Sequence, residues 1–233
     1  MPLLLSKLIF PSLFGLFGIL ILLALGIWQV QRLAWKNKLI GEISRSLTVP
    51  PVRIIPNEIN SDSQYLSISA SGKFLNEELH ILHALKPYGP GFKLIKPFML
   101  SNDKTILVDL GFIQEKNKNQ NTIYTDKFIT GNIFFPNETD FFTPDPNLER
   151  NIWFSRNLDT MADYLGTMPI MVVLSISLDD GVIATPLKPN LNNNHLQYAI
   201  TWFSMALAWG VMSIYLIMRV IKISRHTGGK NAL

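Results

Sequence analysis

The chain of 233 residues contains no cysteine. This absence excludes disulfides, cysteine-based zinc sites, iron–sulfur clusters, copper thiolates and catalytic thiols. The Gly-x-Ser-x-Gly turn, the phosphate-binding loop and the His-Glu-x-x-His zinc motif are absent as well. Without such a constellation, the sequence predicts a protein that is not an enzyme.

Charged side chains are absent from two long apolar runs, residues 8–30 and 196–218. Each run exceeds the roughly 20 residues that a helix needs to span a bilayer. We therefore expect two transmembrane helices that bracket one domain with its own core. A cleaved signal peptide with a site at Ala24-Leu25-Gly26 is the alternative for the first run. The run is longer than the roughly 7–15 apolar residues of a signal core.

Acidic side chains are absent from the C-terminal tail, which carries four cations. The positive-inside rule therefore predicts that both termini are cytoplasmic and that the central domain is periplasmic. Three cations also follow the first run, but a long loop translocates largely regardless of charge. Without an Arg-rich, Ser-rich transit peptide, a bacterial inner membrane fits better than an organelle. The tail cations are Arg219, Lys222, Arg225 and Lys230, and the others are Arg32, Lys36 and Lys38.

The central segment alternates apolar and polar residues in short stretches between turn residues. It predicts an α+β domain with a mainly antiparallel, barrel-like sheet, and the absence of a basic stripe argues against nucleic-acid binding. We expect a first helix at 8–46, the domain at 50–189, a second helix at 193–219 and a basic tail at 220–233. The predicted strands are 66–70, 79–85, 92–100, 105–113, 128–135, 151–156, 170–178 and 182–184, with a short helix capped by Asp159 and ended by Gly166.

Histidines in the domain are weak candidates for metal binding. His80 and His83 are three residues apart on a predicted strand, so their side chains point to opposite faces. The paired carboxylates Glu77-Glu78 and Asp179-Asp180 fall at predicted turns or strand ends, which is typical of solvated surfaces.

The strongest candidate site lies where the second apolar run begins. A stripe of residues at helical spacing starts with an imidazole side chain, and placing a titratable group at membrane depth costs free energy, which favours a functional role. This imidazole is either a haem or metal ligand with aromatic neighbours, or a helix-start residue beside an aromatic belt at the membrane interface. Ala199 and Ala206 flank the stripe and let another helix or a flat ligand approach closely. Its members are His195, Tyr198, Trp202, Met205 and Trp209.

The end of the first run carries a second aromatic and cationic face. Trp28, Arg32, Trp35 and Leu39 recur at spacings of one helical turn. The tryptophans and the cations Arg32 and Lys36 either anchor the helix at the headgroups or hold the carboxylates of an amphipathic ligand.

These segments resemble the Surfeit-locus cytochrome oxidase assembly family. Residues 25–36, LGIWQVQRLAWK, are similar to its opening signature, and residues 193–202, NNHLQYAITW, to its closing one. Between them, residues 88–92, 142–144, 153–158 and Met161-Ala162 match in order. Asp109-Leu110-Gly111-Phe112 departs from the family's Asn-Arg-Gly-Trp, although the glycine is kept.

The resemblance implies a membrane-bound assembly factor for haem–copper cytochrome c oxidase. Such a factor receives haem a, in concert with the haem a synthesis machinery, and passes it to subunit I. On this hypothesis His195 binds the haem iron, Tyr198 and Trp202 flank the macrocycle, and Arg32 and Lys36 beside Trp28 meet the propionates. The competing hypothesis is a scaffold in the lipid bilayer that holds oxidase subunits and binds no haem.

Overall fold

The computed structural model describes residues 2–53, 58–118, 124, 128–178, 181–189 and 191–230. The chain divides into two compact units. One combines Met1–Gly41 with Asn190–Leu233, and the other is Glu42–Pro189.

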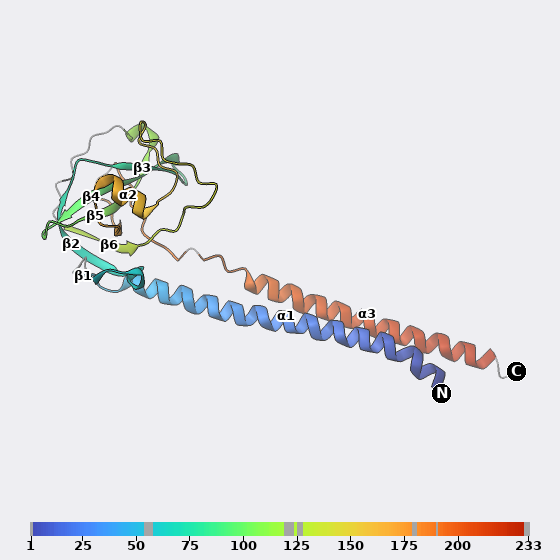
Figure 1. The fold of residues 1–233 in the computed structure, drawn as a ribbon. Coiled ribbons are helices and arrows are strands. Elements are labelled where there is room, and N and C mark those ends of the chain that lie inside the picture. The colour runs from blue at the N-terminus through green and yellow to red at the C-terminus, as the bar shows by residue number, and fades with distance from the viewer. Residues whose placement is uncertain are drawn as a thin grey trace. The chain divides into compact units, whose positions relative to one another are not determined.

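The first unit is a pair of long helices. Helix α1 spans Pro2–Thr48 and α3 spans His195–Lys230. Figure 1 shows them side by side, with the two chain ends at the same end of the pair. Their contacts confirm an antiparallel arrangement, because Gly15 meets Ser213 whereas Gly26 meets Phe203. Both helices are long and apolar enough to cross a membrane, as the sequence predicts.

Small residues let the two helices approach closely. A Cβ atom on Gly18 would lie 2.3 Å from Trp209 Nε1, and one on Gly15 would lie 2.8 Å from Ser213 Cβ. On α3, Ala199 and Ala206 are 2% and 6% exposed. Helices in lipid associate through close packing of this kind, because apolar surface gains nothing by leaving one apolar medium for another.

The second unit is built on a mixed seven-stranded sheet in the order β1-β2-β6-β7-β5-β4-β3. Most neighbours are antiparallel, whereas β1 pairs with β2, and β5 with β7, in parallel. One short helix, α2, accompanies the sheet. The elements are β1 Val52–Arg53, β2 Ser67–Phe74, β3 Leu79–Leu85, β4 Gly89–Leu100, β5 Thr105–Gln114, β6 Phe128–Phe134, β7 Met171–Leu174, α2 Leu158–Leu165, and the 3-10 turns η2 Ser61–Ser63 and η3 Glu115–Asn117.

Strand β2 changes partner at Gly72. It pairs with β6 through Ser67–Ser71 and then with β4 from Gly72 to Phe74. A Cβ atom on Gly72 would lie 2.1 Å from the Met99 carbonyl oxygen, so only glycine allows the close approach. The double pairing links both ends of the row β6-β7-β5-β4, while the barrel itself remains a prediction.

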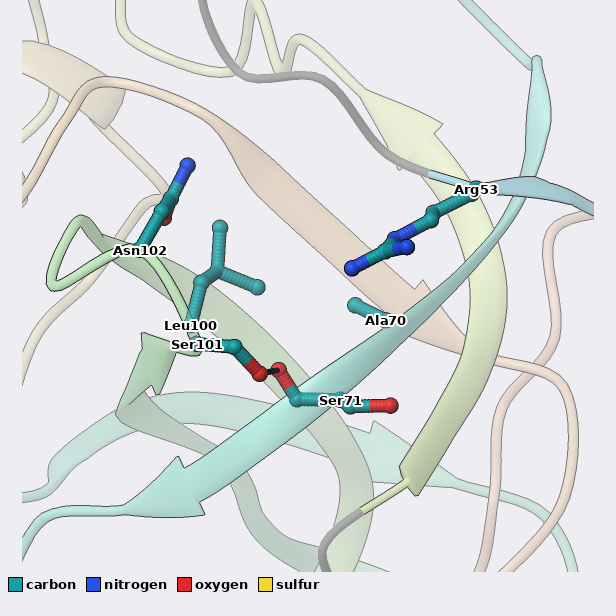
Figure 2. Close-up of a pocket in the computed structure, with 6 residues that line it drawn as sticks. All are labelled: Arg53, Ala70, Ser71, Leu100, Ser101 and Asn102. Atoms are coloured by element: carbon teal, nitrogen blue, oxygen red, sulfur yellow. Dashed lines mark hydrogen bonds between the residues drawn. The ribbon is translucent and has the colours of Figure 1, made fainter.

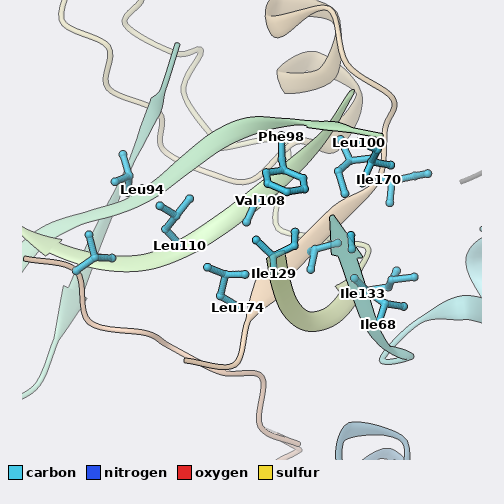
Figure 3. Close-up of a cluster of buried hydrophobic side chains, with 14 of the residues drawn as sticks. Ile68, Leu94, Phe98, Leu100, Val108, Leu110, Ile129, Ile133, Ile170 and Leu174 are labelled. Atoms are coloured by element: carbon cyan, nitrogen blue, oxygen red, sulfur yellow. The ribbon is translucent and has the colours of Figure 1, made fainter. Parts of the chain in front are cut away.

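Two apolar clusters stabilise the sheet. Figure 3 shows the larger one, in which side chains from several strands converge on a shared interior. The smaller cluster lies around Trp153 and Met161 and joins α2 to the sheet. The larger cluster includes Ile68, Leu94, Phe98, Val108, Leu110, Ile129, Ile133 and Leu174.

Several predicted boundaries are wrong. Residues 151–156 form no strand, because Asn151 has a φ of 48° and the segment makes only isolated bridges. The strand predicted at 170–178 ends at Leu174, where pairing with β6 stops at Gly131. Residues 182–184 contribute one bridge, from Ile183 to Phe112.

Two local details near the helix and the turns also differ. Asn157, not Asp159, caps α2, since its side chain accepts from the Thr160 N–H, and Gly166 ends the helix at a φ of 65°. Strand β4 begins at Gly89, three residues before the predicted start at residue 92, and these first residues pair with β3. Asp179-Asp180 lies outside the described residues.

Candidate functional site

His195 is the first residue of α3 and is held by helix α1. Its Nδ1 lies 2.7 Å from Gln29 Oε1, and Gln29 is buried. A carboxamide oxygen only accepts, so this pairing places the ring proton on Nδ1. Nε2 then carries the lone pair that a neutral imidazole offers to a metal. A second hydrogen bond of this kind is how proteins orient histidine ligands.

A second polar contact to α1 comes from Asn193, two residues before His195. Asn193 Nδ2 donates to Asn37 Oδ1 over 2.8 Å. Both bonds join residues at or just before the start of α3 to side chains of α1. The backbone entering the helix is therefore fixed at two points, and the imidazole has a defined direction.

The predicted aromatic stripe divides between two faces of α3. Trp202 and Trp209 lie with His195, Ala199 and Ala206 at spacings of four, three, four and three, on the face that is partly or fully buried against α1.

Tyr198 and Met205 lie on a different face of α3. They are 55% and 47% exposed, so they point away from the helix pair. Trp209 is a packing residue, since its Nε1–H donates to the Gly15 carbonyl over 3.1 Å. The alanines therefore serve helix packing.

The predicted face of α1 forms a cation–π stack. The Arg32 guanidinium lies 5.7 Å from the Trp28 ring centroid and 5.3 Å from that of Trp35. All three side chains are exposed, and Lys36 is half-buried. In the described part of the chain, no hydrogen bond, ion pair or ring contact joins this group to Tyr198 or Trp202. The structure thus forms two groups: His195 with Gln29, and Arg32 with its tryptophans.

The sheet unit holds a buried charge cluster that the sequence did not predict. Asp109 is 0% exposed and accepts from two cations. Lys93 Nζ and Arg156 Nη1 each lie 3.1 Å from Asp109 Oδ2, and the Gly111 N–H donates to Oδ1 over 3.0 Å. The charge cluster consists of the buried Lys93, Asp109 and Arg156 and the exposed Glu138 at its edge. Its opposite charges are equal in number, which offsets part of the desolvation penalty of each buried charge.

Electrostatics inside this cluster are coupled. Burial alone would raise the pKa of Glu138, but hydrogen bonds and attraction from Arg156 hold that pKa below its ordinary value. The same contacts raise the pKa of Arg156 against the opposing effect of its burial. Burial, followed by repulsion from Lys93 and Arg156, lowers the pKa of His83. Folding therefore favours the neutral form of His83 beside the cluster.

His80 lies in a different environment. It is buried, and its Nε2 lies 3.2 Å from Glu78 Oε1 without hydrogen-bond geometry. Lys96 Nζ donates to Glu78 Oε2 over 3.1 Å. Burial would raise the pKa of Glu78, but His80 and Lys96 hold it below its ordinary value. Among the described residues no group of three or more His, Asp or Glu side chains is placed to hold a metal ion.

Several hollows lie on the described surface of the sheet unit. Figure 2 shows a small one of about 140 Å³, with the Arg53 side chain over β2 and a hydrogen bond from Ser101 Oγ to the Ser71 carbonyl. A cleft of about 500 Å³ is bordered by Glu138, Arg156 and the start of α2. The cation that lines it, Arg156, is already paired with Glu138 and Asp109.

Sequence reasoning missed Gln29 and the charge cluster. Gln29 is an isolated amide inside an apolar helix, and polar groups in such positions usually have partners. Asp109 interrupts the apolar run Ile106–Phe112, which is a signal of a buried charge. Their partners lie far away in sequence, so only the fold brings them together.

Comparison with known proteins gives one consistent family. The SURF1 family model matches residues 16–207. Surfeit locus protein 1 of Rattus norvegicus is 32% identical over 230 residues, covering 88% of this chain and 73% of that protein. The SURF1-like protein of Rickettsia conorii is 29% identical over 212 residues, covering 85% of this chain and 87% of that protein.

Proposed function

This chain belongs to the SURF1 family, which supports a general role in cytochrome oxidase assembly, and from that premise we propose that it binds haem a at the membrane and delivers it to subunit I. In this proposal it is an assembly factor and not an enzyme. It works beside the haem a synthesis machinery, within the lipid bilayer.

The contact between His195 and Gln29 carries the proposal. With Nδ1 engaged over 2.7 Å, Nε2 is the nitrogen available to the haem iron. Gln29 acts as a positioning residue that fixes the tautomer and the ring direction. An imidazole oriented in this way has the chemistry to bind haem iron.

The surroundings of His195 suit a flat apolar cargo. Haem a carries a long isoprenoid tail, and each buried Å² of apolar surface is worth about 25 cal/mol. Exposed Tyr198 and half-buried Trp202 lie one and two turns along α3 from His195, where they would flank the macrocycle. Arg32, held against Trp28, and Lys36 would meet the propionates.

The antiparallel helix pair supports the proposed topology. Both chain ends lie at the same end of the pair (Figure 1), and the C-terminal tail is basic. We therefore assign both termini to the cytoplasm and the sheet unit to the periplasm of a bacterial inner membrane. A periplasm-dependent reporter inserted after Lys116 should be active, and the same reporter after Leu233 should be inactive. The reverse pattern would contradict the topology.

Haem binding is tested by the spectrum of the purified full chain from cells that make haem a. The unmodified protein should show a Soret band, and His195→Ala should lose most of it while still inserting in the membrane. His83→Ala is the matched control, because His83 lies in the sheet unit, and its band should be unchanged. An unchanged band in His195→Ala would remove His195 as a ligand.

The second candidate is a scaffold that binds no haem. It is favoured by the same two bonds, since His195 to Gln29 and Asn193 to Asn37 already join the helices. Under this hypothesis the purified protein has no Soret band despite available haem a. His195→Ala would then lower only the stability of the helix pair.

A further inference from the structure

Two adjacent phenylalanines stand in solvent on the sheet unit. Phe141 is 96% exposed and Phe142 is 87% exposed, and their rings meet edge to face with centroids 5.5 Å apart. Aromatic side chains gain most when they are buried. A paired, almost fully exposed apolar surface of this kind is typical of an interaction site.

The turn that presents these rings is built by side-chain hydrogen bonds. Asp140 Oδ1 accepts from the Phe142 N–H and from Thr143 Oγ1, each over 2.9 Å. In return, the Asp140 N–H donates to Thr143 Oγ1 over 2.9 Å. The backbone beneath both rings is thus held in one conformation, which lowers the entropy lost on binding.

The loop that contains the turn is closed at its base. Glu138 and Arg156, at its two ends, form a salt bridge, and Arg156 Nε donates to Glu138 Oε2 over 3.0 Å. The hydroxyl groups of Thr139 and Ser155, which follow Glu138 and precede Arg156 in the loop, lie 3.3 Å apart. The buried charge cluster therefore anchors the loop, and the exposed rings extend from a fixed support.

The charges on the loop that carries the rings indicate the kind of partner. Asp140, Asp145 and Glu149 are exposed on the loop, against the single exposed cation Arg150. These three carboxylates, here called the acidic rim, are repelled by anionic lipid headgroups and by the same carboxylates on a second copy of the chain. It attracts a surface of opposite sign.

We propose that Phe141 and Phe142 form a docking surface for a partner protein that carries an apolar pocket rimmed by lysine and arginine. The rings supply the central apolar contact, and the acidic rim supplies orientation and speed of encounter. This interaction goes beyond the proposed binding of haem a and does not depend on it.

Photo-crosslinking from the full chain in its own membrane tests the proposal. A photoreactive amino acid replaces Pro144, which is exposed two residues beyond Phe142, and the attached residue is identified by mass spectrometry. The expected product joins Pro144 to one site on one other protein, with apolar residues and Lys or Arg around it. Attachment to lipid, to a second copy of the chain, or to scattered proteins would overturn the proposal.

Variants in the same photoreactive background sharpen the test. Phe141→Ser with Phe142→Ser should lower the product yield at least about tenfold, as expected for central interface residues. Phe141→Leu with Phe142→Leu should retain most of it. Asp145→Lys with Glu149→Lys should lower the yield about threefold or more.

Ile176→Ser is the matched control, because Ile176 is an exposed apolar residue of the same unit. Its product yield should be unchanged, as should the thermal midpoint of the serine pair, whose rings are outside the core. Equal yields from the serine pair and the unmodified loop would overturn the proposal even where a cross-linked protein is found.

Discussion

The two units of this molecule bury opposite kinds of groups. Between α1 and α3 the buried residues are glycine, alanine and the amide of Gln29, while large apolar side chains such as Phe17 and Leu207 are exposed. In the sheet unit large apolar side chains such as Phe98 and Phe112 are buried, yet Lys93, Asp109 and Arg156 are buried too. The polar groups named here have hydrogen-bond partners, whereas the buried ring nitrogens of His80 and Nε1 of Trp153 have none among the described residues.

The difference teaches where specificity comes from in each unit. In the helix pair, apolar packing alone leaves the register undefined, so small residues and side-chain hydrogen bonds, among them those of Asn193, His195 and Trp209, set it. In the sheet unit, strand pairing sets the register, and the charge cluster ties the 138–156 loop to β4 and β5. Loss of one bond should therefore act locally in each unit.

The largest expected effect is in the charge cluster. Asp109→Asn removes the anion that Lys93 and Arg156 share, which leaves Lys93 buried without its counter-charge. The free energy of unfolding should fall by about 3–5 kcal/mol. Denaturant titration of the full chain in detergent measures this, with the exposed Glu149→Gln as a control that changes it by less than about 0.5 kcal/mol. A loss as small as the control's would show that the cluster is not needed.

A smaller effect is expected between the helices. Gly18→Leu forces a side chain against Trp209 Nε1, which a Cβ atom alone would approach to 2.3 Å. Overpacking should destabilise the helix pair by about 1–3 kcal/mol. Gly41→Ala is the matched control on the same helix, because nothing lies within 4 Å of that position. Faster proteolysis of Gly18→Leu than of the control is the expected readout, with the β signal of the sheet unit unchanged.

The smallest effect is the pH dependence of the sheet unit. Folding lowers the pKa of His83 from 6.5, mainly by burial, so the folded state takes up its proton less readily than the unfolded state. Stability should therefore fall as the pH drops below 6.5. Glu78 and Glu138 have lowered pKa values, and their contribution is lost at still lower pH, below 4.5.

His83→Gln separates these two steps. The thermal midpoint of the variant should decline less than that of the unmodified chain between about pH 7 and about pH 5, and both should decline below that range. Parallel curves across the upper range would mean that His83 is equally protonated in both states.

Local sequence patterns predicted the elements whose conformation depends on neighbouring residues. The alternation in Leu79–Leu85 predicted β3 at its observed bounds, and the first helix, predicted to end at residue 46, ends at Thr48. The parallel pairing of β5 with β7 was missed, because it joins segments more than 50 residues apart and leaves no local signal. The false strand at 151–156 has strand-like residues, but tertiary contacts of Trp153 and Arg156 set its path.

The candidate site was predicted only in part, because its contacts also join segments that are far apart in the sequence. His195 is visible in the sequence, since a lone imidazole at the start of an apolar run is unusual. Gln29, 166 residues away, became its partner only through the antiparallel packing of α1 and α3. Periodicity grouped Tyr198 with Trp202 and Trp209, yet the helices pack along a slightly different line, through Ala199 and Ala206.

The most direct test of the account replaces the proposed ligand with a free one. His195→Gly, purified with haem a present, should lack the Soret band of the unmodified chain, and added imidazole should restore it by entering the space left by the side chain. Gln29→Leu should keep a weakened band, because the ring loses only its orienting bond. A His195→Gly spectrum equal to that of the unmodified protein, and unaffected by imidazole, would contradict the account.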